Sequence, residues 1–547
     1  MRSRLYGVGL TALLIAIVSA APAPVDAQAV PSPAPTATPD PLTFDGFVRS
    51  YYFTRQNASN NPGVQFDYTP KAPYISNAVN LATWSTGVSL SATYRFPDGG
   101  WFARASYFYS NPLNGPCSVA ANNLKGAKYP SPSCTSQVPP NTNPDDAMPG
   151  FALSTLYEAF VGYDARGWSG KIGDQLFTSP WANPADTRLK PAAFQGADVS
   201  YSAPAGWQVE GADMIEFEGR ANAAFTDTTL LTSYPAGGSG GLPSNIYVPN
   251  CYASGCDGIH TNGFSYGRIG YESSSSPLSG NAYFYGVQNI VDMWWFDAAY
   301  RIAPVSWQPT IALQGGFDRN AGLSYVGNVD SDVFGFKLRA VPAKNVAVSF
   351  GFDDIPWKTS SLVLPSYVSC SSTGATPSYQ IKVAPGKTFP YFLPSQVAQC
   401  STSAAGVTTL YLGGWASPYT DAYTSDPLFT TSEYQGMIQH RSPGTSEKIQ
   451  ATFTSRNNRV VFIASDAWYD YGNALAPQNT NEWDLDGRYR FSPYSGQGPY
   501  RGLVLRDRYQ QRTATNTYYP IPVVPGLPYL GGIPLLKYNR VQAEYDF

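Results

Sequence analysis

Histidine is almost missing from this chain, whose 547 residues include only His260 and His440. Neither histidine stands in a recognisable nucleophile motif, and a serine or cysteine nucleophile usually needs an adjacent general base. Carboxylates are numerous, but no pattern singles out the cooperating pair that a glycosidase uses. With two histidines and no paired C-x-x-C motifs, the chain also has few ligands to offer zinc. We therefore expect no enzyme, no catalytic residues, no metal site and no cofactor.

Charge is also sparse, since Asp, Glu, Lys and Arg make up 13% of the residues and the formal net charge is −3. At the level of the whole chain, this balance gives no indication of nucleic acid or another strongly charged partner. Long apolar runs are missing after the N-terminal stretch, so transmembrane helices are not expected. Strands could still cross a membrane, because alternation dilutes their apolar face by about half.

The first residues, MRSRLYGVGLTALLIAIVSA, place Arg2 and Arg4 ahead of an apolar run that ends in small residues. This pattern predicts a secretory signal peptide that is cleaved after Ala27 or, alternatively, after Ala20. The apolar run is shorter than the roughly 20 residues of a membrane-spanning helix, which disfavours an uncleaved anchor. The following stretch is rich in Pro, Ala and Thr and predicts an extended periplasmic linker. We expect the signal peptide at 1–27, the linker at 28–43 and a β-barrel domain at 44–547.

What the chain has in abundance is glycine, proline and aromatic residues, together with period-two alternation. In EWDLDGRYRF, residues 482–491, the even positions carry Glu, Asp and Arg, whereas the odd positions carry Trp, Leu, Gly, Tyr and Phe. A strand with this pattern has one apolar face and one charged face. A water-soluble sandwich would give the same alternation, so this feature alone does not identify a membrane barrel.

The lengths of the connections discriminate better, because a membrane barrel has short periplasmic turns and longer extracellular loops. The short links fall at 97–100, 165–167, 204–206, 273–279, 303–306, 342–345 and 457–458, with a longer one at 492–501. The long segments lie around 57–80, 111–152, 177–195, 219–262 and 355–444. Threading strands between these links predicts an all-β, transmembrane antiparallel β-barrel of about 18 strands, give or take two. The weakest joint is near IVDMWW, where the chain must turn outside on almost no loop.

The six cysteines form three local pairs, each within one segment assigned to the outer side: Cys117 with Cys134, Cys251 with Cys256, and Cys370 with Cys400. An exported chain meets an oxidising compartment, so three disulfides within large loops are the natural interpretation. Metal binding is the alternative, which the scarcity of histidine disfavours.

The chain ends in NRVQAEYDF, and its last strand alternates apolar residues with charged ones. The apolar set, Val541, Ala543, Tyr545 and Phe547, resembles the signal that the outer-membrane barrel assembly machinery recognises. This set would face lipid while the strand closes against the first one, leaving no open edge in the membrane. The ending therefore predicts the cell outer membrane as the location, with outer-membrane lipid and the assembly machinery as partners.

Several motifs, in their order along the chain, resemble the OprD-type substrate-specific outer-membrane porins. They are FVRSYYFTR, KIGDQLFTSPWANPADTRLKPAAFQG, NAYFYGVQNIVDMWWFDAAY, NVDSDVFGFKLRAVPAKNVAVSFGF, SDPLFTTSEYQG with SPGTSEKI, EWDLDGRYRF and GLVLRDRY. The second motif resembles a strand and the family's third loop through Gly173, Pro180, Asp186, Arg188, Pro191, Phe194 and Gly196. The chain departs from the family in its Pro-rich linker, its long 355–444 segment and Asp507, which falls on the apolar parity.

The resemblance implies a monomeric barrel of eighteen strands, with inward loops and a track of basic side chains that leads small solutes, often carboxylate-bearing ones, through the lumen. The polar parity of the strands gives the candidate track: Lys337, Arg339, Lys448, Arg456, Arg488, Arg490, Arg506, Arg508, Arg512 and Arg540. Asp186, Arg188 and Lys190 would add charge at the narrowest point if the third loop folds inward, whereas an exposed loop is the alternative. Arg49 and Arg55 are weaker candidates because Phe47, Tyr51 and Phe53 share their parity.

Two questions stay open at this point. The basic residues could form a conducting track for anions, or they could pair with neighbouring acids in a mainly structural wall. The barrel could be a porin for small anionic solutes, an exporter of acidic polysaccharide, or a non-conducting structural or adhesive barrel.

Overall fold

The computed structural model describes residues 41–58, 81–97, 99–113, 152–186, 188–220, 222–230, 261–302, 304–323, 329–356, 358, 360–364, 368–371, 378–384, 387–391, 399–402, 408–412, 414–420, 425–433, 436–440, 443–471, 478–491, 502–515 and 535–547. The chain divides into two units, residues 1–40 and 41–547. The predicted signal peptide lies outside the described residues, as does most of the predicted linker. The first strand begins at Leu42, within the range expected for that linker.

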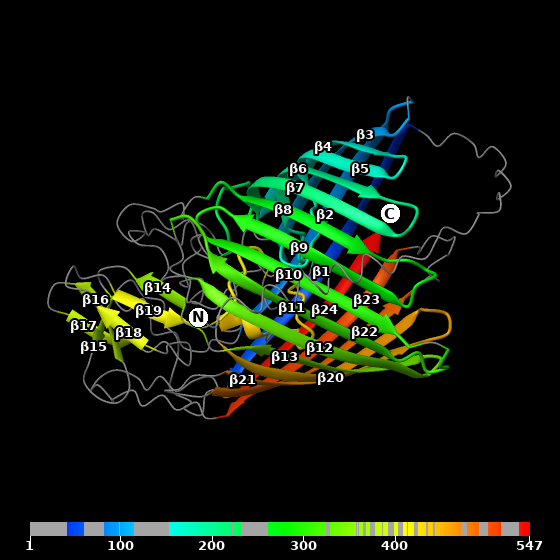
Figure 1. Cartoon of the computed structure of the whole chain (residues 1–547). Coiled ribbons are helices and arrows are strands. Elements are labelled where there is room, and N and C mark those ends of the chain that lie inside the picture. The colour runs from blue at the N-terminus through cyan, green and yellow to red at the C-terminus, as the bar shows by residue number, and fades with distance from the viewer. Residues whose placement is uncertain are drawn as a thin grey trace, which may run out of the picture. The chain divides into compact units, whose positions relative to one another are not determined.

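Eighteen antiparallel strands form one closed sheet (Figure 1). The strands are β1 (Leu42–Ala58), β2 (Leu81–Arg95), β3 (Trp101–Pro112), β4 (Leu153–Ala165), β5 (Trp168–Gln175), β6 (Ala193–Ser202), β7 (Trp207–Glu218), β8 (Phe264–Tyr271), β9 (Leu278–Val287), β10 (Val291–Arg301), β11 (Thr310–Asn320), β12 (Asp330–Ala343), β13 (Val346–Ile355), β20 (Gly444–Thr454), β21 (Val460–Tyr471), β22 (Gln478–Arg490), β23 (Leu503–Thr515) and β24 (Leu535–Asp546). Each strand pairs with its neighbours in the chain, and β1 pairs with β24 to close the ring. The predicted barrel of eighteen antiparallel strands is confirmed.

The strands turn an apolar face outward. Ile172 is 65% exposed on β5, and Val541 and Phe547 at the end of the chain are 45% and 50% exposed. The outward positions of β1 are Phe44, Val48 and Tyr52, so its odd residues, Arg49 among them, face the interior. A continuous apolar outer surface of this kind suits the hydrocarbon of a membrane. Among the described residues, no helix combines the length and the apolar character needed to cross a membrane.

Short turns join β4 to β5, β6 to β7 and β12 to β13 at the end of the barrel where β1 begins and β24 ends. Arg166 and Gly167 join β4 to β5 with φ angles of 57° and 82°, the mirror-image turn that matches the twist of a hairpin. At the opposite end, β9 turns directly into β10 through residues 288–290. Asn289 adopts a φ of 60° there, and its side-chain oxygen accepts a hydrogen bond of 3.1 Å from the Leu323 backbone NH. The positive φ of Asn289 therefore allows the tight turn between β9 and β10, the connection that looked weakest in the sequence.

Replacing Asn289 with Val should lower the free energy of unfolding by about 1–2 kcal/mol, because a β-branched residue is strained at a positive φ. Asn289→Gly is the matched control: it accepts the same φ, loses only the hydrogen bond to Leu323 and should cost less. The stability of both variants can be compared by electrophoresis of samples heated to increasing temperatures, because the folded barrel migrates faster than the unfolded chain. Equal transition temperatures for the Val and Gly variants would contradict this account of the turn.

The long segment between β13 and β20 contains two small sheets. The first consists of β14 (Ser360–Leu364), β18 (Gln399–Thr402) and β19 (Thr408–Leu412), and the second of β15 (Val368–Ser371), β16 (Ser378–Ala384) and β17 (Lys387–Tyr391). Cys370 lies in β15 and Cys400 in β18, but their side chains are outside the described part of the chain, as are Cys117, Cys134, Cys251 and Cys256 altogether. The three disulfides therefore stay a prediction.

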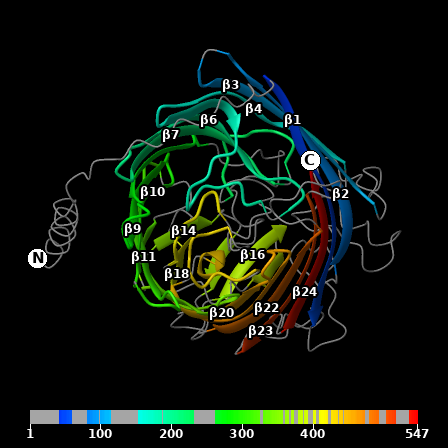
Figure 2. The ribbon, with the colours of Figure 1, turned by 90° about the vertical axis from the view of Figure 1, so that its right-hand side faces the viewer.

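Two connecting segments fold into the barrel (Figure 2). The third loop, residues 176–186 and 188–192, lies between β5 and β6 in the chain. The tether segment, defined here as residues 414–420, 425–433 and 436–440, lies between β19 and β20 and includes the short 3-10 helix η3 (Met437–His440). Backbone pairing between Ala182 and Tyr419 joins the two segments. The predicted inward course of the third loop is therefore what the structure shows.

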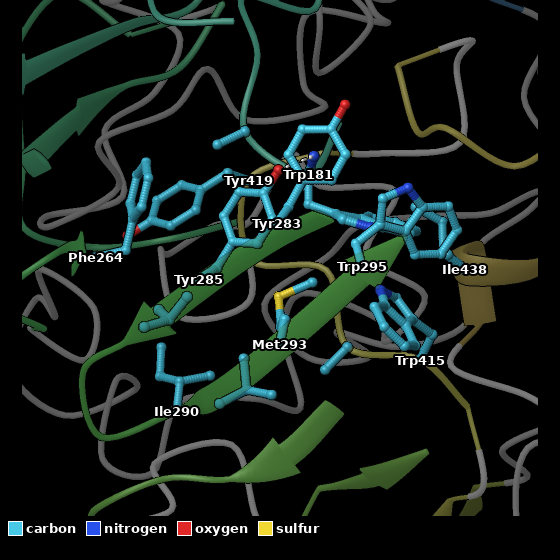
Figure 3. Packing of buried hydrophobic residues seen from close by; sticks show 14 of the residues in the cluster. Trp181, Phe264, Tyr283, Tyr285, Ile290, Met293, Trp295, Trp415, Tyr419 and Ile438 are labelled. Atoms are coloured by element: carbon cyan, nitrogen blue, oxygen red, sulfur yellow. Dashed lines mark hydrogen bonds between the residues drawn. The ribbon is translucent and has the colours of Figure 1, made fainter. Parts of the chain in front are cut away.

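Aromatic residues hold these segments against one side of the barrel wall (Figure 3). The tryptophan cluster consists of Trp181 from the third loop, Trp295 from β10 and Trp415 from the tether segment; the ring centroids of Trp181 lie 5.1 Å from those of both partners. Gly316 on β11 makes room for it, because a Cβ atom there would lie 2.9 Å from Trp295 and 3.0 Å from Trp415. Burial raises the pKa of the nearby Tyr419 phenol, which stays neutral. Apolar packing thus fills this side of the lumen.

Candidate functional site

The opposite side of the interior carries the basic residues of β22, β23 and β24. Arg508 lies directly across from Asp486 on one neighbouring strand and from Arg540 on the other. Arg488 lies opposite Arg506 in the same register. These side chains have the inward parity of three adjacent strands, as the sequence predicted. They therefore form one contiguous surface, which we call the basic wall, defined by Arg488, Arg506, Arg508 and Arg540.

Asp486 is shared by three of these arginines. The Arg506 fork binds it through two hydrogen bonds, Nε to Oδ1 at 2.8 Å and Nη2 to Oδ2 at 2.5 Å. Arg488 Nη2 lies 3.1 Å from Oδ2, and Arg508 Nε lies 3.6 Å from the same atom. One carboxylate is thus shared among three guanidinium groups. These contacts show that this part of the wall is salt-bridged, whereas a conducting track for anions stays a prediction.

A second acid approaches the basic wall from the tether segment. Glu433 accepts a hydrogen bond from Arg508 Nη1. The residues just before it are fixed to the barrel: Lys448 Nζ on β20 donates to the Thr431 carbonyl at 2.6 Å, and Thr430 donates to Asp353 on β13 through its backbone NH and its hydroxyl, at 2.8 and 2.7 Å. Lys448, predicted as a pathway residue, is therefore an inward cation that also anchors this segment.

The third loop meets the barrel wall at Arg49 of β1. Arg49 forms a bidentate pair with Asp186, at 2.5 Å for Nη1–Oδ1 and 2.9 Å for Nη2–Oδ2. Its Nε atom lies 3.0 Å from Glu544 of the last strand, and Nη1 donates to the Arg188 carbonyl at 3.3 Å. Asp186 keeps 42% of its side chain exposed, whereas Arg188 is only 3% exposed. The loop thus presents a carboxylate to the lumen and keeps its arginine largely covered.

Lys190 has a different role from the one that the sequence predicted. Its Nζ lies 2.6 Å from Glu218 of β7, and both side chains are 0% exposed. Thr155 of β4 donates a further hydrogen bond of 3.0 Å to the same carboxylate. A cation with no contact to solvent cannot line a pathway. Lys190 instead anchors the third loop to the wall.

The remaining predicted cations are distributed over several elements. Lys337 and Arg339 face inward from β12, with Lys337 Nζ 5.8 Å from the Phe429 ring centroid and Arg339 exposed. Arg490 and Arg512 have the inward parity of β22 and β23 and are partly buried. Arg456 does not lie on the strand that the sequence predicted for it. The strand β20 ends at Thr454, and Arg456 is exposed in the following turn. No group of three or more His, Cys, Asp or Glu among the described residues is arranged to hold a metal.

No protein-family model matches the chain, and no curated protein matches it. Solved structures do match: Acinetobacter baumannii OccAB2 superimposes with a TM-score of 0.58 at 13% identity, over 93% of this chain and 98% of that one. The chain has the fold of an OprD-type porin. The resemblance that the sequence motifs indicated is therefore confirmed at the level of the fold.

Two further structures with the OprD-type fold were solved with small molecules. Pseudomonas aeruginosa OccK2 (OpdF) in complex with glucuronate has a TM-score of 0.57 and 12% identity, covering 92% of this chain and 96% of that one. Pseudomonas aeruginosa OpdK with vanillate has a TM-score of 0.56 and 12% identity, covering 92% of this chain and 98% of that one.

Sequence reasoning missed one charged residue of this site, Glu433, and ranked another, Arg49, as only a weaker candidate. Arg49 shares its strand face with Phe47 and Tyr51, so the usual rule of polar inside and apolar outside gave no answer there. Glu433 stands in a connecting segment, where strand parity has no meaning. Its only sequence signal is its place in SDPLFTTSEYQG, one of the motifs that carry the resemblance.

Proposed function

We propose that this protein is an outer-membrane porin for the diffusion or uptake of small solutes, with a preference for anionic, carboxylate-bearing ones. The observation that carries the proposal is the basic wall, in which Arg488, Arg506 and Arg508 gather around one carboxylate, Asp486. The OprD-type fold and the apolar outer surface support the outer-membrane location and the function of a channel rather than an enzyme. We also propose a monomer that is inserted by the barrel assembly machinery.

The chemistry of the wall suits a carboxylate. An arginine fork can donate two parallel hydrogen bonds to a planar anion, and it keeps its charge at every physiological pH. Rings or rows of such cations favour anions, while a series of weak sites lets the anion leave again. Arg488 is the most accessible member of the group around Asp486, with 33% of its side chain exposed. Glucuronate and vanillate, named for OccK2 and OpdK, are both carboxylates, which agrees with this solute class.

Reversal potentials under a KCl gradient, measured on single channels of the purified full-length protein, test the proposal. The wild type should prefer chloride over potassium. A unit charge about 4 Å from an ion in water contributes about 1 kcal/mol, so the double variant R488Q/R506Q should lower the anion-to-cation permeability ratio by about fivefold or more. R456Q removes an exposed arginine from a turn and should leave the ratio unchanged.

Two outcomes would reject the proposal. A barrel without measurable conductance would favour a structural or adhesive role, and a preference for cations would exclude the anion pathway. Passage of acidic polysaccharide fragments in preference to monomeric carboxylates would favour the exporter.

A further inference from the structure

Glu433 occupies a position within the basic wall that resembles that of a bound ligand. Its carboxylate accepts a hydrogen bond from Arg508 and interacts electrostatically with Arg506, Arg540 and Lys448. These cations come from β20, β23 and β24, whereas Glu433 comes from the tether segment. The carboxylate therefore reaches the wall from a separate part of the chain, as a solute carboxylate would.

The surroundings of Arg508 require an anion. Arg508 and Arg540 lie directly opposite each other on paired strands, an arrangement in which like charges repel. Asp486 is engaged by both donor atoms of Arg506 and lies 3.6 Å from Arg508 Nε, beyond a good hydrogen bond. Glu433 supplies the negative charge that is closest to Arg508. The side chain of Glu433 is still 15% exposed, so the contact borders on solvent.

The tether segment holds Glu433 at this place without depending on the contact with Arg508. Thr430 is bound to Asp353, the Thr431 carbonyl is bound to Lys448, and Tyr469 Oη donates to the Thr430 carbonyl at 2.6 Å and to Ser432 Oγ at 3.0 Å. These bonds fix the backbone just before Glu433 to β13, β20 and β21. Loss of the Glu433 charge should therefore leave the segment in place and the arginines available.

We propose that Arg508, flanked by Arg506 and Arg540, is a carboxylate-binding subsite that Glu433 occupies as a tethered internal ligand, so that a solute carboxylate competes with Glu433 for it. This inference rests on the proposed function and goes beyond it by naming the subsite and its competitor. The competition weakens each encounter with a solute. A weaker site releases its anion sooner, which favours passage over retention.

Block of the single-channel KCl current by sodium propionate tests the inference on the full-length protein. A hydrogen bond to a charged group is strong enough that freeing Arg508 should tighten propionate binding about tenfold in E433Q relative to the wild type. E433D keeps the charge but withdraws it from Arg508, and its affinity should lie between the two. E210Q is the matched control, because Glu210 pairs with Arg268 at 3.7 Å on β7 and β8, on the other side of the barrel; its affinity should equal that of the wild type.

The outcomes separate this inference from the proposed function. An E433Q channel that conducts but binds propionate no more tightly than the wild type would show that Glu433 only holds the tether segment in place. The same conclusion would follow from tightening of equal size in E210Q. If E433Q does not fold, an unchanged affinity in E433D overturns the inference. In E433Q/R508Q the gain should disappear. A wild type that forms no channel would instead refute the proposed function itself.

Discussion

Replacing Lys190 with Ala should lower the free energy of unfolding by about 3–5 kcal/mol, because removal of one partner leaves the other charge buried and unpaired. The partner is Glu218, whose side chain is as inaccessible as that of Lys190. The hydrogen bond from Thr155 to the carboxylate would persist, but it cannot replace a counter-charge. The same substitution releases the third loop from β7, so larger fluctuations of the open-channel current should accompany the loss of stability.

The controls for Lys190 follow from its pairing. K190M/E218Q removes both charges and should recover most of the stability, because no unpaired ion is then left in the interior. K344A removes an exposed lysine from the turn between β12 and β13 and should have little effect. Thermal unfolding in detergent, followed by circular dichroism, measures all three variants. A loss below about 1 kcal/mol for K190A, the range of an exposed pair, would show that water reaches Glu218 and that the anchor is weak.

Replacing Trp295 with Ala should also destabilise the protein by about 3–5 kcal/mol, since a large buried ring leaves a cavity that its surroundings fill only partly. Trp295 is 1% exposed and contacts Trp181 and Trp415, with ring centroids 5.1 and 5.9 Å away. The substitution therefore weakens the attachment of the third loop and of the tether segment at once. We expect a lower unfolding temperature together with a larger mean conductance.

Trp294 is a control of the same residue type on the same strand. It points outward, is 41% exposed, and pairs with Phe284 at a ring-centroid distance of 4.7 Å. Loss of such an aromatic pair is worth about 0.5–1.5 kcal/mol, and the conductance should not change, because the lumen is untouched. If W294A and W295A changed the conductance equally, the tryptophan cluster would not be what holds the inward segments.

Strand parity predicted the barrel and most of the basic wall because the two faces of each strand meet different environments. Lipid outside and polar groups inside select opposite residue types at successive positions, as in β22, where Asp486 and Arg488 face inward and Tyr489 faces outward. Asp507 keeps the outward parity that the sequence indicated, and Asn539 of the next strand donates a hydrogen bond of 3.0 Å to it. The alternation is a local property, so it can be read without knowing the tertiary structure.

Strand parity did not predict the side chains that pack against the inward connecting segments instead of facing lipid or the lumen. The inward face of β1 packs Tyr51 against the protein itself, in a cluster with Leu189 of the third loop, so apolar residues are favourable on both faces of that strand. The burial of Lys190 and the approach of Glu433 to Arg508 depend on the paths of long connecting segments. Those paths are fixed by contacts between residues far apart in the sequence, which no local pattern encodes.

The position of Arg49 links the third loop to the closure of the barrel. Arg49 lies opposite Glu544 in the pairing of the first strand with the last, and the same guanidinium group binds Asp186 of the third loop. Backbone hydrogen bonds between Gly46 and Phe547, at 3.2 and 3.0 Å, complete this junction. The full set of contacts can form only after the C-terminal strand has arrived. A barrel in which β1 and β24 have not yet paired would consequently lack the contact between Arg49 and Glu544, so closure of the sheet also completes the attachment of the third loop to the wall.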